Sequence, residues 1–363
     1  MSEYKKSPII INHNRVWRIY SGGKLLDEFC GSPEGEDSFY PEDWIASVVE
    51  ANNLPRENQP EREGLSTVYG SDGEFLKDII EQNASEILGD DHLNRYGKNL
   101  GFLVKLLDSA VRLPIQVHPD KDAARKFFSS DYGKTEAWYI LGGREIGDEK
   151  PYILIGFKDG IKAEDWESYF EKQDINAMEN ALHKVYVKPG DLFLIKGGIP
   201  HAIGPGCFLL EIQEPTDYTI SVEKKAPDGS VVPDFLCHQG IGFDKMFSCF
   251  HYDGDNFENT LKKYKIIPKS EFKDENIDVQ NLITYKHTPA FSLNLINVKG
   301  SYVLKEKNRA RILVVISGMA KFQHQEITIH VKRGDIVFLP SEIKNIKVFS
   351  DEIQLIECLP PEI

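Results

Sequence analysis

The sequence is poor in the features of secreted, membrane and nucleic-acid-binding proteins. Its five cysteines are an odd number and form no Cys-x-x-Cys pair, so we expect reduced thiols in a cytoplasmic protein. No apolar run approaches a membrane span, and the opening MSEYKKSPIII is too short and too polar for a signal peptide. Positive charge is also scarce. The net charge of −14 argues against nucleic acid or an anionic membrane as a partner.

The remaining composition is that of an ordinary globular protein, with 41% hydrophobic and 28% charged residues. A chain of 363 residues can bury a large core and can hold two domains. If the substrate is anionic, then lysine, arginine or a metal must attract it locally, because the overall field is negative.

Four side chains form a pattern that suits a divalent metal. Gln116 and His118 stand two residues apart in LPIQVHPD, so the alternation of a strand would put both on one face. Glu136 begins the apolar run EAWYIL, and His201 follows the turn KGGIP. Two imidazoles, one carboxylate and one amide can hold a divalent metal with open coordination positions. We therefore predict that neighbouring strands of one β-barrel bring these residues to a metal.

Each residue of this set also has an ordinary interpretation. A single histidine on an apolar strand is usually a hydrogen-bonded core or surface residue, and motif matches carry a false-positive risk. Glu136 alone would most often be a solvated charge. It is followed, however, by the apolar run AWYI, where an unpaired carboxylate would be costly. A metal is the simplest partner for it.

Longer segments around these residues carry a family resemblance. QVHPD, YGKTE and GIPHA, in that order, are similar to the motifs of the type I phosphomannose isomerases, which are zinc-dependent cupins. The N-terminal RVWRIYSGGKLLDEFCG is similar to the opening segment of that family. The resemblance runs from about Val16 to about Phe250 and continues weakly to the end. The dioxygenase-type cupin pattern, with two histidines one residue apart, is absent.

The resemblance implies a zinc site and a set of substrate-side residues. His118, Glu136 and His201 would bind zinc, with Gln116 in the fourth ligand position. Lys134 would contact the substrate or stabilise its enediolate, and Lys105 matches a lysine on the phosphate side.

Two acidic residues after His201 complete the expected site. Glu211, an isolated charge in FLLEIQ, matches a family carboxylate near the metal and is our candidate base; a structural pairing with a lysine is the alternative. Asp217 is expected to orient its neighbours.

One position departs from the family pattern. The family typically carries an active-site arginine four residues after the aspartate that Asp217 matches, and here Ser221 stands at that position. A hydroxyl supplies neither the charge nor the bidentate fork of a guanidinium. Lys224 or Lys225 would have to reach the site instead, which requires a bulge in the strand.

An internal repeat favours a tandem β architecture. VKPGDLFLIKGG begins at Val187 and VKRGDIVFLPSE begins at Val331, and in both a Gly-Asp turn precedes an apolar strand. The same spacing applied to His201 leads to Asn345, so the second copy lacks that ligand. We predict a mainly β protein with helical insertions, built from tandem cupin (jelly-roll) β-barrels. Residues 1–240 would form the metal-binding domain, with helical insertions at about 74–90 and 163–185, and residues 241–363 a metal-free cupin-like β-domain.

Together these features predict a zinc-dependent enzyme of carbohydrate metabolism with one divalent metal per chain. The resemblance implies interconversion of mannose 6-phosphate and fructose 6-phosphate through a cis-enediol, with Lys134 and Glu211 as catalytic residues and the role of position 221 open. One alternative is an isomerase that acts on another sugar or sugar phosphate. The other is a non-catalytic metal-cupin that binds a sugar phosphate, an alternative that Ser221 keeps open.

Overall fold

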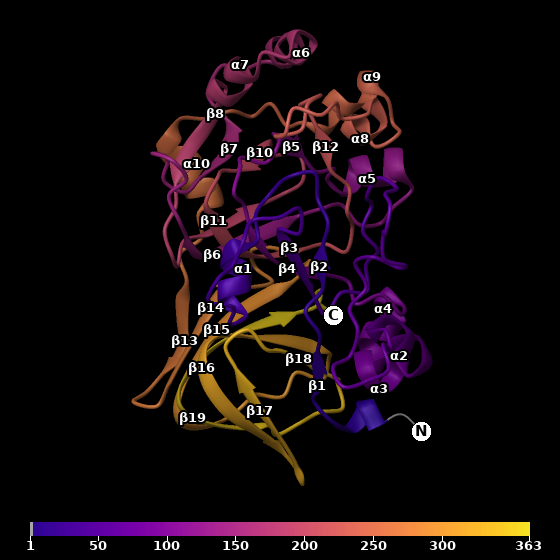
Figure 1. The fold of residues 1–363 in the computed structure, drawn as a ribbon, viewed down its shortest axis with the longest axis vertical. Coiled ribbons are helices and arrows are strands. Elements are labelled where there is room, and N and C mark those ends of the chain that lie inside the picture. Colours follow the sequence, from indigo (N-terminus) through magenta and orange to yellow (C-terminus); the bar gives the residue numbers. More distant parts are fainter. Residues whose placement is uncertain (1–2) are drawn as a thin grey trace.

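The N-terminal part of the protein contains two antiparallel sheets. The computed structural model describes residues 3–363 (Figure 1). The six-stranded sheet has the order β2 (Arg15–Val16), β3 (Glu42–Ile45), β4 (Leu103–Asp108), β11 (Cys207–Gln213), β6 (Glu136–Gly143) and β9 (Leu192–Ile195). The five-stranded sheet has the order β12 (Ile220–Ser221), β5 (Gln116–Val117), β10 (His201–Ile203), β7 (Tyr152–Phe157) and β8 (Leu182–Tyr186).

The third sheet contains the C-terminal strands and one strand from the N-terminus. Its order is β1 (Ile9–Ile11), β18 (Ile336–Leu339), β16 (Arg311–His324), β19 (Lys347–Leu359), β15 (Ser292–Val303), β14 (Ile277–Ile283) and β13 (Lys269–Lys273), with β17 (Ile327–Lys332) paired to β16. The pairings of the long strands shift register at several points, and such bulges bend a sheet. This curved sheet forms the lower part of the molecule in Figure 1.

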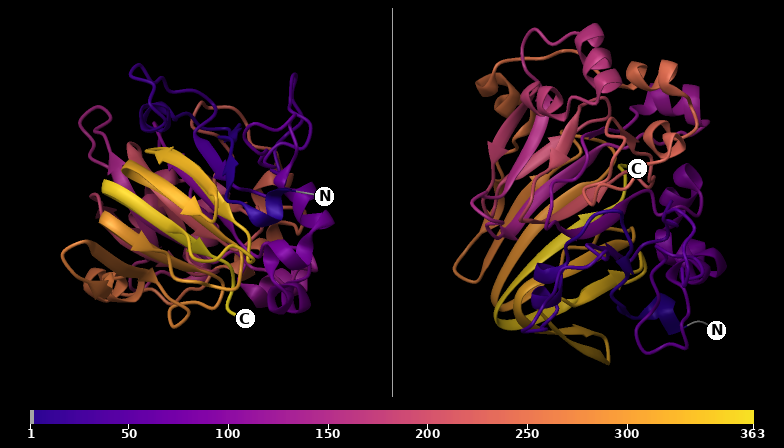
Figure 2. Two further views of the ribbon diagram at one scale, coloured as in Figure 1. Left: turned by 90° about the horizontal axis from the view of Figure 1, so that it is seen from below. Right: turned by 45° about the horizontal axis from the view of Figure 1, so that its top comes forward.

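Short helices cover the margins of the sheets. They are α1 (Lys24–Phe29), α2 (Leu76–Gln82), α3 (Ala84–Leu88), α4 (Asp90–Tyr96), α5 (Lys121–Phe128), α6 (Ala163–Lys172), α7 (Ile175–Asn180), α8 (Asp234–His238), α9 (Phe243–Met246) and α10 (Phe257–Tyr264), with 3₁₀ turns at Glu3–Lys6 and Phe247–Cys249. Figure 2 shows α2–α4 grouped along one side of the molecule. No helix within residues 3–363 has both the length and the apolar character needed to cross a membrane.

The two predicted helical insertions differ in how far they follow the prediction. The segment 74–90 folds as helices α2 and α3 and leads directly into α4. In the segment 163–185 the helices end at Asn180, and Leu182–Tyr186 is strand β8 instead. The reason is tertiary, because β8 pairs with β7 and buries Leu182 and Val185 in the core. Local periodicity does not report such a pairing.

The six-stranded sheet lies between two apolar cores, and this arrangement determines where its polar side chains point. Along β6, Trp138 and Ile140 contribute to the core shared with the five-stranded sheet, whereas Ala137 and Tyr139 contribute to the core shared with the third sheet. Because side chains alternate along a strand, Glu136 must point the same way as Trp138. The same alternation directs Lys105 on β4 and Glu211 on β11 toward the five-stranded sheet.

The predicted fold class is confirmed. The chain is mainly β with helical insertions, and the pairings among residues 3–363 form packed sheets rather than a barrel closed by hydrogen bonds. The predicted repeat is also visible in the backbone. Asp191 and Asp335 each accept a hydrogen bond from a backbone N–H three residues earlier, at 3.1 and 2.8 Å. The preceding glycines of the two turns, Gly190 and Gly334, have φ values of 88° and 95°.

Candidate active site

Two strands of the five-stranded sheet and one strand of the six-stranded sheet bring the predicted metal ligands together. His201 opens β10 and is the register partner of Gln116 on β5, and His118 directly follows β5. Glu136 opens β6 in the other sheet. His118, Glu136 and His201 are buried, and their ligand atoms lie within 4.8 Å of one another. The structure thus brings together the three residues that we expected to bind metal.

The hydrogen bonds of the two histidines fix which ring nitrogens face the centre. His118 Nδ1 is 2.8 Å from the carbonyl oxygen of Tyr218, and His201 Nδ1 is 2.8 Å from that of Ile199. A carbonyl only accepts, so both Nδ1 atoms carry the proton and both Nε2 atoms carry a lone pair. Burial, with the nearby Lys134 as second cause, lowers the pKa of His118 to about 4, and burial lowers that of His201. Both rings are therefore neutral.

These lone pairs and the Glu136 carboxylate surround a position that suits a cation. His118 Nε2 and His201 Nε2 are 3.2 Å apart, although neither has a proton to share. Glu136 Oε2 is 3.1 Å from His118 Nε2, Glu136 Oε1 is 3.4 Å from His201 Nε2, and neither carboxylate oxygen accepts a hydrogen bond. Buried acceptors that face one another are costly unless a positive charge lies between them. The donor set therefore fits a divalent metal.

Lys134 and Gln116 connect the candidate metal ligands to the adjoining pocket. Lys134 Nζ lies 2.9 Å from His118 Nε2 and 3.2 Å from Glu136 Oε2. Burial alone would raise the pKa of Glu136, but the ammonium group of Lys134 holds that pKa well below its usual range. Gln116 Nε2 is 3.3 Å from His201 Nε2. Both side chains also line a pocket beside the site, so a molecule in that pocket would contact them directly.

The pocket has a balanced set of charges and an uncharged rim. Its charged lining residues are Arg18, Lys105, Lys134, Glu42, Glu211 and Asp217. The rim includes Trp17, Asn52, Asn53, Thr219, Ser221 and Gln239. An Asn52 Nδ2 to Gln239 Oε1 hydrogen bond of 3.1 Å joins two sides of the rim. Three basic and three acidic groups cancel, so a positive pocket requires a bound metal.

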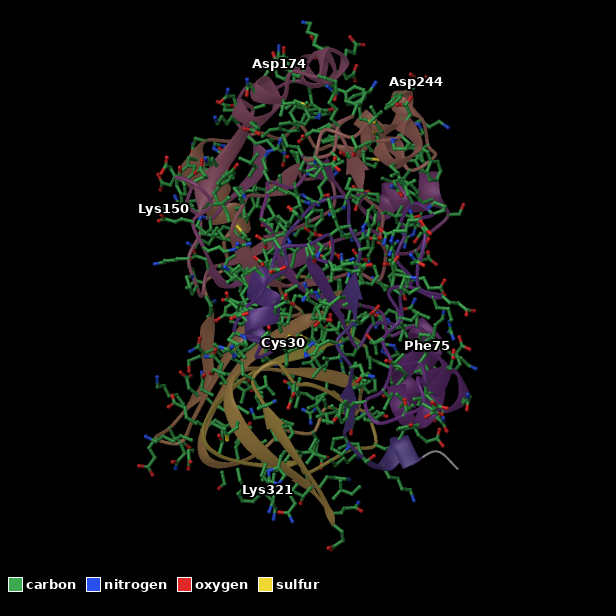
Figure 3. The ribbon with its side chains drawn as sticks, viewed as in Figure 1. Cys30, Phe75, Lys150, Asp174, Asp244 and Lys321 are labelled. Carbon is green, nitrogen blue, oxygen red and sulfur yellow. The ribbon has the colours of Figure 1, made fainter. Side chains whose placement is uncertain are left out.

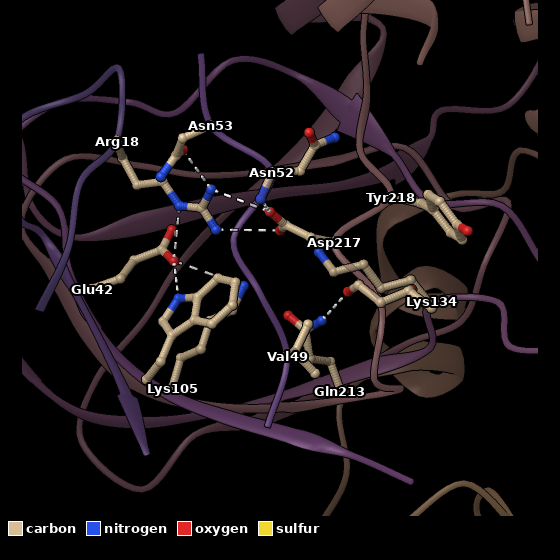
Figure 4. A network of polar contacts seen from close by, with 12 residues as sticks. Arg18, Glu42, Val49, Asn52, Asn53, Lys105, Lys134, Gln213, Asp217 and Tyr218 are labelled. Carbon is tan, nitrogen blue, oxygen red and sulfur yellow. Dashed lines mark hydrogen bonds and ion pairs between the residues drawn. The ribbon is translucent and has the colours of Figure 1, made fainter. Parts of the chain in front are cut away.

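The sequence did not lead us to Arg18, which makes several polar contacts at the pocket (Figure 4). Its guanidinium donates to both carboxylate oxygens of Asp217, at 3.2 and 3.3 Å, and its Nε lies 3.0 Å from Glu42 Oε2. It also donates to Asn53 Oδ1 at 3.1 Å. Two features of the segment RVWRIYSGG could have indicated it: an arginine beside aromatic residues and the family resemblance of that segment.

The expected orienting role of Asp217 agrees with these contacts. Besides holding Arg18, Asp217 accepts a hydrogen bond from the backbone N–H of Asn52 at 3.1 Å, which fixes the loop at the pocket rim. Burial alone would raise the pKa of Asp217, but Arg18 and Lys105 lower it. The side chain is therefore an ionised link between β12, the rim loop and Arg18.

Lys105 and Glu211 form a buried pair on the pocket wall. Lys105 Nζ is 3.2 Å from Glu211 Oε1 and 3.8 Å from Glu42 Oε2. The other oxygen of Glu211 accepts a 3.0 Å hydrogen bond from Trp138 Nε1. Both predicted residues face the pocket, but each already has a partner of opposite charge or a hydrogen-bond donor.

Ser221 also lines the pocket, and the lysines that follow it do not. It lies on β12 opposite Gln116, and its Oγ exchanges weak hydrogen bonds of 3.3 and 3.4 Å with the backbone of Glu223. Lys224 Nζ lies over the rings of Phe170 and Phe243, 4.8 and 4.7 Å from their centroids. Lys225 is exposed. Neither lysine contributes its ammonium group to the pocket wall.

Asn345 lies in an exposed loop of the C-terminal part, with φ of 55°. Within residues 3–363, clusters of three metal-ligating side chains occur only at His118/Glu136/His201 and at His13/Cys30/Asp43. Neither cluster includes a residue beyond position 201. That the C-terminal β-domain holds no metal stays a prediction.

Comparison with known families agrees with the resemblance that the motifs indicated. Residues 60–137 match the family described as "Phosphomannose isomerase type I, catalytic domain", and residues 281–360 match "Mannose-6-phosphate isomerase, cupin domain". The mannose-6-phosphate isomerase ManA of Bacillus subtilis is 26% identical over 69% of this chain and 73% of its own length. The putative mannose-6-phosphate isomerase YvyI of the same organism is 23% identical over 94% of this chain and 96% of its own length.

The fold is similar to that of solved phosphomannose isomerases. A mannose 6-phosphate isomerase structure from Bacillus subtilis superimposes with a TM-score of 0.74 at 23% identity, over 97% of this chain and 99% of the other. A putative mannosephosphate isomerase from Archaeoglobus fulgidus gives a TM-score of 0.71 at 21% identity, over 98% and 99%. At these identities the likeness establishes the shared fold.

Proposed function

Because the chain is related to the type I phosphomannose isomerases in sequence and in fold, we propose that it interconverts mannose 6-phosphate and fructose 6-phosphate. The observation that carries this proposal is the buried trio His118, Glu136 and His201, whose acceptor atoms point at one another beside a pocket lined by Lys134. An aldose–ketose isomerase needs a Lewis acid, a base that moves a carbon-bound proton, and cationic groups that orient a phosphate.

We propose zinc as the resident metal, with His118, Glu136 and His201 as its protein ligands and Gln116 as a fourth. A divalent metal held there would polarise the sugar carbonyl and the neighbouring hydroxyl. Gln116 fits this role if its amide oxygen, rather than its nitrogen, faces His201, because amide orientation is assigned from the surrounding hydrogen bonds. The histidine–carbonyl bonds keep both ligand nitrogens unprotonated.

Glu211 is our proposed base for the proton that moves between the two carbons of a cis-enediol. Its carboxylate pairs with Lys105 at 3.2 Å, and the Trp138 N–H fixes its orientation. An ionised, oriented carboxylate is the form in which a glutamate accepts a proton. The alternative, a purely structural pair of Glu211 and Lys105, predicts that their loss reduces stability and leaves the chemical step of the remaining folded enzyme unchanged.

Lys134 is the proposed cation beside the reacting carbons. Its ammonium group already lies within 2.9 Å of His118 Nε2, so a metal at the trio would repel it toward the pocket. There it would stabilise the negative charge that develops on the enediolate. This role does not require a conformational change larger than a rotation of the lysine side chain.

Arg18 is the proposed source of the guanidinium that Ser221 does not supply. Arg18 and Ser221 both line the pocket, and Arg18 is held by Asp217, four residues before Ser221. Its planar fork can bind two phosphate oxygens. Lys105, which we expected to anchor phosphate, has Glu42 and Glu211 as neighbours, so any contact with phosphate competes with these ion pairs.

Turnover of fructose 6-phosphate by the metal-loaded protein tests the proposal directly. Parallel assays with free mannose and with other sugar phosphates separate an isomerase of different specificity from the proposed one. Binding of mannose 6-phosphate without turnover would support the non-catalytic alternative. We also propose a cytoplasmic location, which the five free cysteines support.

A further inference from the structure

A second cluster of metal-ligating side chains lies on the opposite face of the six-stranded sheet from the pocket. His13 lies between β1 and β2, Cys30 is the C-cap of α1, and Asp43 lies in β3 between two residues that point toward the other face. The ligand atoms of these three residues lie within 4.8 Å of one another. Figure 3 labels Cys30 where the N-terminal part meets the C-terminal sheet.

The three side chains converge on a single point. His13 Nδ1 is 2.6 Å from Asp43 Oδ2 and 3.7 Å from Cys30 Sγ, so the same ring nitrogen faces both partners. Asp43 is fully buried, and its other oxygen accepts a 2.7 Å hydrogen bond from the backbone N–H of Asn14, which aims Oδ2 at the cluster. The single proton on His13 Nδ1 can be donated in a good hydrogen bond to Asp43, and the contact between this nitrogen and the Cys30 sulfur is then a poor one.

We propose that His13, Cys30 and Asp43 form a second metal site, separate from the active site, for a divalent cation of the zinc class. A thiolate, an imidazole and a carboxylate are donors that zinc and cobalt accept and that magnesium and calcium do not favour. Two ligands of a tetrahedral zinc stand about 3.3 Å apart, since each bond is about 2.0 Å. His13 Nδ1 must therefore move outward from Asp43 Oδ2 by about 0.7 Å from its present 2.6 Å, and the 38% exposed side chain has room to do so.

The position of the cluster indicates a structural role for the metal. Strand β1 pairs with β18 in the third sheet, and His13 follows β1 by two residues. The turn before β18 contacts the end of α1, where Arg333 Nε donates to the Phe29 carbonyl at 3.2 Å. A metal at this point would tie the N-terminal segment to α1 and β3 at the junction with the C-terminal sheet, and binding to the folded state alone raises the melting temperature.

Cobalt titration of the full chain tests the site without any isomerase assay. A thiolate bound to Co²⁺ gives a near-ultraviolet sulfur-to-metal charge-transfer band, and the trio at the active site contains no sulfur. We expect this band to saturate at one Co²⁺ per chain, to disappear in Cys30→Ser and in His13→Gln, and to persist in His330→Gln, which removes an exposed histidine of β17. Absence of the band in the parent protein would overturn the proposal.

Zinc stoichiometry and thiol protection give an independent readout. Cys30 is the one cysteine that is not buried among the five free cysteines, so a thiol reagent under native conditions reports on it. We expect Zn²⁺ to slow the labelling of Cys30 at least 10-fold. Zn²⁺ should raise the melting temperature of the parent more than that of Cys30→Ser. It should also increase the metal content from one to two per chain in the parent but not in Cys30→Ser. Equal zinc content and equal melting shifts in the two proteins would show that the cluster is only an ion pair beside a thiol. These outcomes do not depend on the proposed isomerase activity.

Discussion

Truncation of His201 to alanine should remove the metal from the active site and leave the fold intact. His201 Nε2 lies 3.2 Å from His118 Nε2 and 3.4 Å from Glu136 Oε1, so its ring is one of three sides of the site. Structural zinc sites bind with roughly 10–16 kcal/mol. If three protein ligands share that free energy, one of them contributes about 3–5 kcal/mol, and its loss weakens binding about 10²- to 10⁴-fold.

A matched control separates loss of the metal from loss of stability. His183 is also a buried histidine on a strand of the five-stranded sheet, and its Nε2 is 2.8 Å from the carbonyl oxygen of Asp255. His201→Ala and His183→Ala each remove a buried imidazole and its hydrogen bond to a backbone carbonyl, at a cost of about 1–3 kcal/mol. The two variants should therefore lose similar stability, whereas only His201→Ala should lose the metal.

The measurement is the metal content after equilibration with a chelator of known affinity. All proteins carry Cys30→Ser, so that the second cluster does not contribute, and melting temperatures are recorded beside the metal content. We expect about one metal per chain in the parent and in His183→Ala, and almost none in His201→Ala. Equal metal in the parent and in a folded His201→Ala would refute the assignment of His201 as a ligand.

Three further predictions concern the pocket. If Arg18 already supplies the guanidinium, Ser221→Arg should change kcat/KM for mannose 6-phosphate less than 10-fold; a larger increase would show that the position lacks a needed cation. Lys134→Met should lower kcat/KM about 10- to 150-fold at unchanged metal content, because a charge-assisted contact contributes about 1.5–3 kcal/mol. Lys105→Met should lower kcat/KM to the same extent only if Lys105 contacts phosphate or supports Glu211. Activity equal to the parent in both variants would contradict these roles. The pKa of Asp217 is lower in the folded state than in the unfolded chain. The Asp217 carboxylate therefore stabilises the fold above about pH 4, and this stabilisation is lost as the pH falls through the folded-state pKa. Acid denaturation of Asp217→Asn should accordingly depend less on pH than that of the parent.

Much of the candidate site was predictable because its residues stand in local motifs. The spacing of QVHPD and the position of Glu136 at the start of an apolar run indicated strand-borne ligands, and strand alternation then fixed the face to which they point. Helix α5 was predictable for a similar reason, since Asp120 caps it by accepting the N–H of Ala123 at 2.8 Å. Both interpretations depend on a few neighbouring residues only.

Contacts between distant segments were not predictable in this way. Arg18 and Asp217 are 199 positions apart, and no local pattern states that a guanidinium near the N-terminus fills the pocket beside Ser221. The same holds for β8, where pairing with β7 overrides a helical pattern. Cys30 was expected to be one more reduced thiol, and only the meeting of α1, β3 and the segment after β1 places it beside His13 and Asp43.

The sequence by itself therefore determined the strand-rich character of the chain, the candidate metal ligands and the kind of chemistry they suit, because alternation and motif spacing act over a few residues. The tertiary structure alone decided which buried charges neutralise each other in the pocket. Lys105 faces the pocket as alternation requires, yet its partners Glu42 and Glu211 come from β3 and β11, the strands on either side of β4. An ion pair depends on the distance between charges in space, and that distance is set by strand order and by the packing of sheets from remote parts of the chain.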